Sequence, residues 1–75
     1  MEQSFYVPPD LCQWIEHHIQ KPIAGFEHKK KANGQYYSYE EQLKATKYQL
    51  TLIASTYLQS GKTSPEVVQR LQWFA

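Results

Sequence analysis

The chain has 75 residues, is 41% hydrophobic with 2 Trp, 6 Tyr and 3 Phe, and carries a net charge of +1 at pH 7. This length allows one small domain, and so many large apolar residues exclude a disordered tail. The near-neutral charge excludes a global field for nucleic acid or an anionic membrane. The single cysteine cannot form an internal disulfide. We expect a cytoplasmic protein, because the sequence shows neither a membrane span nor a signal peptide.

The first predicted helix covers residues 10–20. Pro8 and Pro9 hold the preceding backbone extended, and Asp10 is the predicted N-cap. Apolar residues then recur at four-residue steps, which is helical spacing, at Leu11, Ile15 and Ile19. The helix should end before Pro22, because a proline pushes the residue ahead of it out of the α region.

Residues 21–37 form a predicted connector, for which two interpretations stay open. Asn33-Gly34 is a strong signal for a tight hairpin turn, because both positions accept a positive φ. The flanking residues 26–29 and 35–37 could then pair as a short β-hairpin. We prefer a polar connector, since an isolated two-stranded hairpin is barely stable in water.

A long helix over residues 38–60 and a C-terminal helix over residues 64–75 complete the prediction. Ser38 and Glu41 match a capping box, and Gly61 suits the position that ends a helix. The apolar face of the long helix consists of Leu43, Leu50, Ile53, Ala54 and Tyr57, widened by Tyr48 and Leu52. Ser64 is the expected cap of the last helix, ahead of Pro65. Two amphipathic helices joined by so short a turn should pack antiparallel.

No residue set in the sequence points to catalysis, a metal or a cofactor. The soft and imidazole groups are Cys12, His17, His18 and His28. A reactive thiolate needs a nearby base, but His17 and His18 do not share the helix face of Cys12. Adjacent histidines also point in different directions, unlike a pair four residues apart. We therefore expect no catalytic, metal-binding or cofactor-binding residue and no cofactor.

The run Lys29-Lys30-Lys31 is a candidate anion contact. With Tyr36 and Tyr37 close by, it could combine phosphate contacts with base stacking, as single-strand binding proteins do. A run this short is more often part of a solvated loop, and the rest of the chain neutralises it. Nucleic acid is therefore an unlikely partner, and we expect no membrane contact.

The C-terminal helix carries more apolar surface than one packed face can hide. The candidate interface residues are Val67, Leu71, Trp73 and Phe74, together with Trp14 of the first helix. Exposed aromatic patches usually mark binding surfaces, and so short a chain must bury nearly all its apolar side chains to fold. Pairing two copies about a two-fold axis would hide the same patch against itself. We expect a homodimer with Trp73 and Phe74 near its interface, and a protein partner of unknown identity.

The run Thr63-Ser64-Pro65-Glu66-Val67-Val68, preceded by Gly61, resembles the second-helix start of the small Bacillus sporulation-type aspartyl-phosphate phosphatases. Those proteins are helical hairpins of similar size that dephosphorylate response regulators. Their signature, Ser-Gln-Glu-Leu-Asp, falls on residues 71–75, where only Gln72 matches and Ala75 occupies the aspartate position. The resemblance implies the hairpin and a regulatory role, and it carries over no catalytic residue.

A second resemblance concerns the start of the chain. Phe5, Val7 and Pro8 before a short helix are similar to the opening of a set of small uncharacterised Bacillus helical proteins (YvfG-like). This resemblance implies a helical fold that could dimerise, with no known activity.

The sequence thus predicts a mainly α, three-helix protein built on an antiparallel helical hairpin, as a single domain over residues 1–75. Its segments are an extended arm (1–9), a short helix (10–20), a connector (21–37), a long helix (38–60) and a C-terminal helix (64–75). The favoured function is that of a non-enzymatic regulatory or interaction protein acting through protein–protein contacts. Two alternatives are a phosphatase-like modulator of response-regulator signalling and a nucleic-acid accessory protein using Lys29–Lys31.

Overall fold

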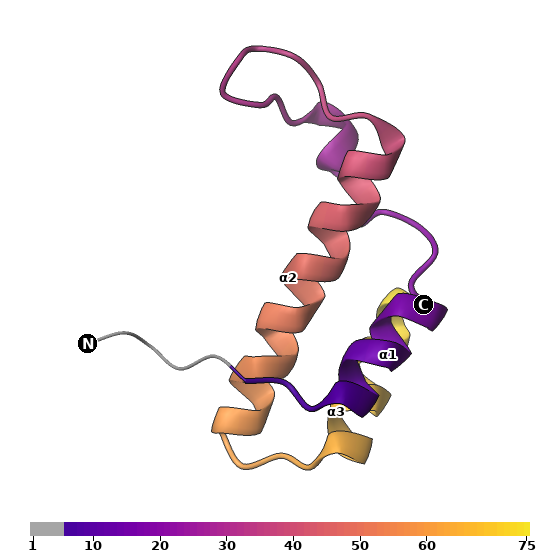
Figure 1. The fold of residues 1–75 in the computed structure, drawn as a ribbon, viewed down its shortest axis with the longest axis vertical. Coiled ribbons are helices and arrows are strands. Elements are labelled where there is room, and N and C mark those ends of the chain that lie inside the picture. The colour runs from indigo at the N-terminus through magenta and orange to yellow at the C-terminus, as the bar shows by residue number, and fades with distance from the viewer. Residues whose placement is uncertain (1–5) are drawn as a thin grey trace, which may run out of the picture.

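The computed structural model describes residues 6–75, and this part of the chain is mainly helical. Its elements are α1 (Pro9–His18), the 3₁₀ helix η1 (Phe26–His28), α2 (Tyr39–Gln59), α3 (Ser64–Leu71) and the 3₁₀ helix η2 (Gln72–Phe74). The long helix α2 runs along the molecule, and α1 and α3 pack beside its C-terminal part and against each other (Figure 1). The mainly α, three-helix prediction is confirmed. Within residues 6–75, no helix is both long and apolar enough to cross a membrane.

The apolar core lies where the three helices meet. Its buried residues come from all three helices and from the residue that follows α1: Leu11, Ile15, Ile19, Leu50, Ala54, Val67 and Leu71. Burying one such leucine or isoleucine side chain contributes about 1.5–3 kcal/mol, so this cluster is the main source of stability. Figure 1 shows that α3 folds back beside α2 after the turn. The predicted face of α2 is only partly correct, because Tyr48 stays 61% exposed.

The boundaries of α2 are set as the sequence predicts. The Ser38 Oγ accepts the N–H of Glu41 at 3.2 Å, and the Glu41 carboxylate accepts the N–H of Ser38 at 2.9 Å. These two bonds satisfy amides that the first turn of a helix leaves without partners. At the other end, Gly61 has a φ of 100° and donates its N–H to the Leu58 carbonyl at 3.0 Å. A residue with a side chain would be strained at this φ, so glycine ends the helix here.

The N-cap predicted for α1 is wrong. The helix begins at Pro9, and the Pro8 carbonyl accepts the N–H groups of Leu11 and Cys12, each at 3.1 Å. Pro9 has a φ close to helical and no N–H that needs a partner, so the helix can start before Asp10. Asp10 lies instead in the first turn, where its negative charge favours the positive end of the helix dipole. The helix ends at His18, ahead of Pro22 as expected.

The N-cap predicted for α3 is also one residue off. Thr63 is the cap, and its N–H donates to the Glu66 carboxylate at 2.9 Å. Glu66 stands three positions after Thr63, which is the capping-box spacing, whereas it is only two positions after Ser64. The last helix is also shorter than the predicted range of residues 64–75, since α3 ends at Leu71 and continues as η2.

The β-hairpin alternative for the connector is not supported. Residues 26–29 should have supplied its first strand, but Phe26–His28 form η1 instead. Among the described residues, a single antiparallel bridge joins Lys30 and Tyr36 around Asn33-Gly34. Gly34 has a φ of 87°, but Asn33 lacks the positive φ that the predicted turn requires, and the Gly34 N–H donates instead to the Lys31 carbonyl at 2.9 Å. The connector is a polar loop with one 3₁₀ turn.

Candidate functional site

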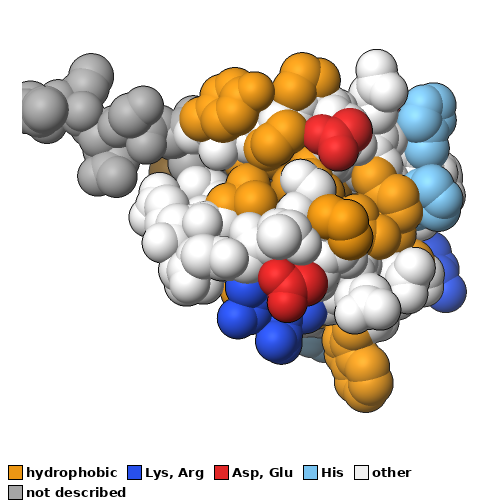
Figure 2. All heavy atoms as spheres, turned by 90° about the horizontal axis from the view of Figure 1, so that it is seen from below, with side chains coloured by type: hydrophobic (Ala, Val, Ile, Leu, Met, Phe, Trp, Pro, Cys, Tyr) orange, Lys and Arg blue, Asp and Glu red, His pale blue; other side chains and the backbone are white. Residues whose placement is uncertain are grey.

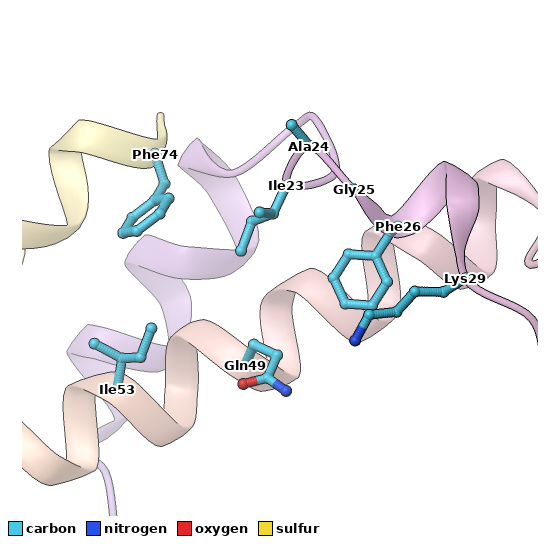
Figure 3. Close-up of a pocket in the computed structure, with 8 residues that line it drawn as sticks. All are labelled: Ile23, Ala24, Gly25, Phe26, Lys29, Gln49, Ile53 and Phe74. Atoms are coloured by element: carbon cyan, nitrogen blue, oxygen red, sulfur yellow. The ribbon is translucent and has the colours of Figure 1, made fainter.

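Two adjoining hollows lie around Phe74, between the connector, α2 and η2. The first has a volume of about 290 Å³ and is lined by Ile23, Ala24, Gly25, Phe26, Lys29, Gln49, Ile53 and Phe74 (Figure 3). The second has a volume of about 440 Å³ and is lined by Lys21, Pro22, Ile23, Ala24, Trp73, Phe74 and Ala75. The two hollows share Ile23, Ala24 and Phe74. We call them together the Phe74 groove.

The first hollow has apolar walls and a polar rim. In Figure 3, the side chains of Ile23, Ile53 and Phe74 point into the space between the connector, α2 and η2. The Phe26 ring closes the far end, and the Lys29 ammonium lies 5.3 Å from the centre of that ring. Small apolar concavities with a few polar groups at the edge are the usual form of a binding site.

A glycine turn and two backbone hydrogen bonds fix the position of the connector residues that line the groove. Gly25 has a φ of 108°, a turn that a residue with a side chain would resist. Its N–H donates to the Glu27 carboxylate at 3.0 Å, directly ahead of η1. The backbone N–H groups of Glu27 itself and of Gly25 stabilise the charged carboxylate and lower the pKa of Glu27. Two residues before Gly25 in the sequence, the Ile23 N–H donates to the hydroxyl of Thr46 on α2 at 2.9 Å.

The five predicted interface residues lie in three different places. Trp73 is 87% exposed and lines the second hollow, and Phe74 is half-buried and lines both. Val67 and Leu71 are fully buried in the core, so their side chains offer no surface to a second chain. Trp14 is half-buried on α1 and stacks on the His18 ring at a centroid distance of 4.6 Å. Only Trp73 and Phe74 therefore meet at the groove.

The three lysines of the predicted anion contact are each engaged within the chain. Lys31 donates to the Glu41 carboxylate at 2.8 Å. This bond, followed by the bond from the Ser38 N–H, lowers the pKa of Glu41 to about 2. The Lys30 ammonium lies 5.3 Å from the centre of the Tyr36 ring, and Lys29 lies over Phe26. The ammonium groups thus have separate partners rather than one shared anion site.

The surface charges form no field of one sign on the face that Figure 2 shows. Hydrophobic, basic, acidic and histidine side chains are all visible there, with the acidic ones among the others. This mixed pattern agrees with the net charge of +1. Long-range attraction of a polyanion would need a larger single-sign patch.

The soft and imidazole groups do not gather into a ligand set. Within residues 6–75, no cluster of three histidine, cysteine or acidic side chains could hold a metal ion. The Cys12 thiol points to the Val7 carbonyl at 3.7 Å, and the His18 Nδ1 lies 3.1 Å from the Trp14 carbonyl. His28 lies beside Glu27 at 3.6 Å. Cys12, His18 and His28 thus each have a separate local contact.

Sequence reasoning missed the connector and α2 walls of the groove, formed by Ile23, Phe26, Gln49 and Ile53. The available signal was two large apolar residues, Ile23 and Phe26, inside a segment that otherwise reads as polar. No protein-family model, curated protein or solved structure matches the chain. The two resemblances drawn from sequence motifs stay predictions.

Proposed function

We propose that this chain is a small, non-enzymatic interaction protein that works through protein–protein contacts at the Phe74 groove. The observation that carries the proposal is the exposure of Trp73, 87% of whose surface faces solvent at the edge of the second hollow of this groove. Tryptophan is among the residues most enriched at the centres of protein interfaces. A small soluble fold gains nothing from exposing its largest apolar ring next to a hollow unless something covers both.

The free energy that burial of the exposed Trp73 side chain would contribute supports this proposal. A tryptophan side chain buries roughly 150–250 Å², which at about 25 cal/mol per Å² corresponds to roughly 4–6 kcal/mol of gross hydrophobic free energy. A domain of this size has a total stability of only about 5–15 kcal/mol. Covering Trp73 would therefore matter to the protein as much as one of its core residues does.

We further propose a regulatory role in the bacterial cytoplasm, which the sequence motifs favour. The phosphatase alternative has less support, because Ala75 stands where the resembling family has its aspartate. The nucleic-acid alternative has less support because Lys31 pairs with Glu41, while Lys29 and Lys30 lie over aromatic rings. Loss of phosphate from a phospho-aspartyl receiver domain on adding this protein would favour the first alternative over our proposal.

Affinity capture from the native host, compared between matched variants, tests the proposal. Gln49→Arg places a charged side chain in the first hollow from an exposed position on α2, and Trp73→Ala removes the exposed ring. Tyr48→Ala is the control, because Tyr48 is also exposed but lines neither hollow. We expect the wild type and the control to retain the same protein, and both groove variants to lose most of it. Equal recovery by all four proteins, or recovery of nothing by any, would contradict the proposal.

A further inference from the structure

We propose that the Phe74 groove binds a short acidic segment of another protein, in which a large apolar side chain lies next to an aspartate or a glutamate. The inference rests on the proposed function and names the chemistry of the partner at the same surface. The apolar side chain enters the first hollow, and the carboxylate meets the lysines at the rim. Two features of the groove carry it: the charge of the rim, and the size and walls of the first hollow.

The ionisable side chains that line the groove are both positive. They are Lys29 in the first hollow and Lys21 in the second, and both are exposed. Among residues 6–75, no acidic side chain lines either hollow. The acidic residue nearest to them in the sequence is Glu27, and its carboxylate already accepts the N–H of Gly25 at 3.0 Å. The side chains of the groove therefore offer a positive rim to a partner.

Within the part of the chain that the structure describes, neither of these two lysines forms an ion pair. The lysines that do, Lys31 and Lys47, line neither hollow. Lys29 lies 5.3 Å from the centre of the Phe26 ring, at the end of the first hollow (Figure 3). A lysine ammonium has three N–H donors, so one that faces a ring can still donate to a carboxylate. One such donor suffices for a single acidic residue, whereas a nucleic-acid backbone is bound by many cationic groups together.

The first hollow has the size and the walls for an anchoring side chain. Its volume of about 290 Å³ is at the lower end of the range for ligand pockets, roughly 300–1,000 Å³. The side chains of Ile23, Ile53 and Phe74 point into it (Figure 3). An apolar side chain that enters would be buried against all three, as the anchor residues of protein interfaces are. The exposed Trp73 ring lines the adjoining hollow, where it can cover the residues next to the anchor.

The homodimer predicted from the sequence has less support on this surface. In a two-fold contact the same patch of both copies meets itself, so Lys21 and Lys29 of one copy would approach those of the other. Like charges brought together in this way oppose association. An acidic segment meets the same rim with complementary charge, which also speeds the encounter of the two proteins. Salt screens exposed charges, so its affinity should fall as salt is added.

A phage-displayed library of random short peptides, selected against the purified full chain, tests the inference. We expect the enriched peptides to share a large apolar residue next to an aspartate or a glutamate. Fluorescence anisotropy then measures the affinity of an enriched peptide for the wild type and for two variants. Lys29→Glu should weaken binding on the order of tenfold, because an attractive exposed pair becomes a repulsive one.

Lys30→Glu is the matched control and should change the affinity by no more than about twofold. Lys30 is exposed next to Lys29 in the sequence, and its ammonium also lies 5.3 Å from the centre of a ring, that of Tyr36. It lines neither hollow, so its replacement makes the same change of net charge away from the groove. Circular dichroism should show wild-type helix content for both variants.

An exchange of charges separates a direct contact from a damaged surface. The same peptide with its acidic residue replaced by lysine should bind Lys29→Glu more tightly than it binds the wild type. Enriched peptides without an acidic residue, no enrichment at all, or equal affinity for Lys29→Glu and the wild type would each overturn the inference.

The Gln49→Arg variant distinguishes these failures from a failure of the proposed function. If it abolishes the binding of a peptide that ignores Lys29→Glu, the groove still binds protein, and the proposed function stands with a partner of different chemistry. If it leaves the affinity of every enriched peptide unchanged, the peptides bind elsewhere, which contradicts the inference and the proposed function together. A dimer in sedimentation equilibrium that Gln49→Arg abolishes would overturn the inference and identify a second copy as the occupant.

Discussion

The hydroxyl of Thr46 accepts the backbone N–H of Ile23 at 2.9 Å, and this bond ties the connector to the middle of α2. Thr46 is fully buried, although threonine is polar, and Ile23 lines both hollows of the groove. One hydrogen bond between residues far apart in the sequence thus places the groove's connector wall. The stability of the fold and the shape of the groove should depend on it together.

Thr46→Val should destabilise the protein and loosen the groove. Valine has nearly the same shape but no acceptor, so the Ile23 N–H loses its partner at a cost of about 1–3 kcal/mol. Urea denaturation followed by circular dichroism measures this change. Thr46→Ser is the matched control: it keeps the acceptor and loses only a methyl group, at about 1 kcal/mol. A valine variant as stable as the wild type would show that the hydrogen bond contributes nothing net.

Leu50→Ala should cost about 2–5 kcal/mol, because Leu50 is fully buried at the centre of the three-helix core. That is a large share of the total stability expected for a small domain, so much of the variant should be unfolded at 37 °C. Tyr48→Ala, two positions earlier on the exposed face of α2, should change stability by less than about 0.5 kcal/mol. Thermal denaturation of both variants measures the contrast. Similar losses for the two would contradict the burial pattern of α2.

Glu41 should make stability fall at acid pH. Folding lowers its pKa from 4.5 to about 2, mainly through the hydrogen bond from Lys31 and then the one from the Ser38 N–H. A carboxylate whose pKa is lowered on folding stabilises the fold above its unfolded pKa. This contribution is lost as the pH falls from about 4.5 to about 2.

Glu41→Gln isolates this contribution, because glutamine keeps the shape of the capping box but does not titrate. We expect the variant to be less stable than the wild type at pH 7, with the difference shrinking toward pH 2. Urea midpoints measured across this range supply the test. A difference that stays constant with pH would mean that the charge of Glu41 does not contribute.

The wild type should show no tight binding of single-stranded DNA, so replacing Lys29, Lys30 and Lys31 together by alanine should remove only a weak, non-specific affinity. Each ammonium already has a separate partner within the chain, at Phe26, Tyr36 and Glu41 respectively. Fluorescence anisotropy with labelled single-stranded DNA at several salt concentrations measures the affinity. Tight, salt-dependent binding by the wild type that the triple variant abolishes would instead favour the nucleic-acid alternative.

The elements whose start and stop signals are local could be predicted well. The capping box at Ser38 and Glu41 and the left-handed Gly61 define α2 from a few neighbouring residues. The predicted caps of α1 and α3 are wrong by two residues and by one residue, because Pro8 precedes α1 in place of Asp10 and Thr63 precedes α3 in place of Ser64. The residue that caps a helix is the one that best satisfies the backbone N–H groups of the first turn.

The groove could not be predicted, because its walls come from three segments that only the tertiary fold brings together. Ile23, Ile53 and Phe74 are far apart in the sequence. Thr46 occupies a buried position that an apolar pattern would leave to a hydrophobic residue, and its partner is the Ile23 backbone. The apolar pattern of the C-terminal residues also could not show which side chains face the core and which are exposed for an interface. Val67 and Leu71 are buried in the core. Trp73 is exposed and lies in η2, the 3₁₀ helix that follows α3.

Photo-crosslinking in the native host tests the central claim most directly. A photoreactive phenylalanine analogue placed at position 73 replaces an exposed ring by another, so it leaves the core intact. The same analogue at position 48, which lines neither hollow, is the matched control. If the protein works through protein–protein contact at the Phe74 groove, irradiation should give a discrete protein adduct from position 73 and none from position 48. The absence of an adduct at position 73, or equal adducts at both positions, would contradict the account.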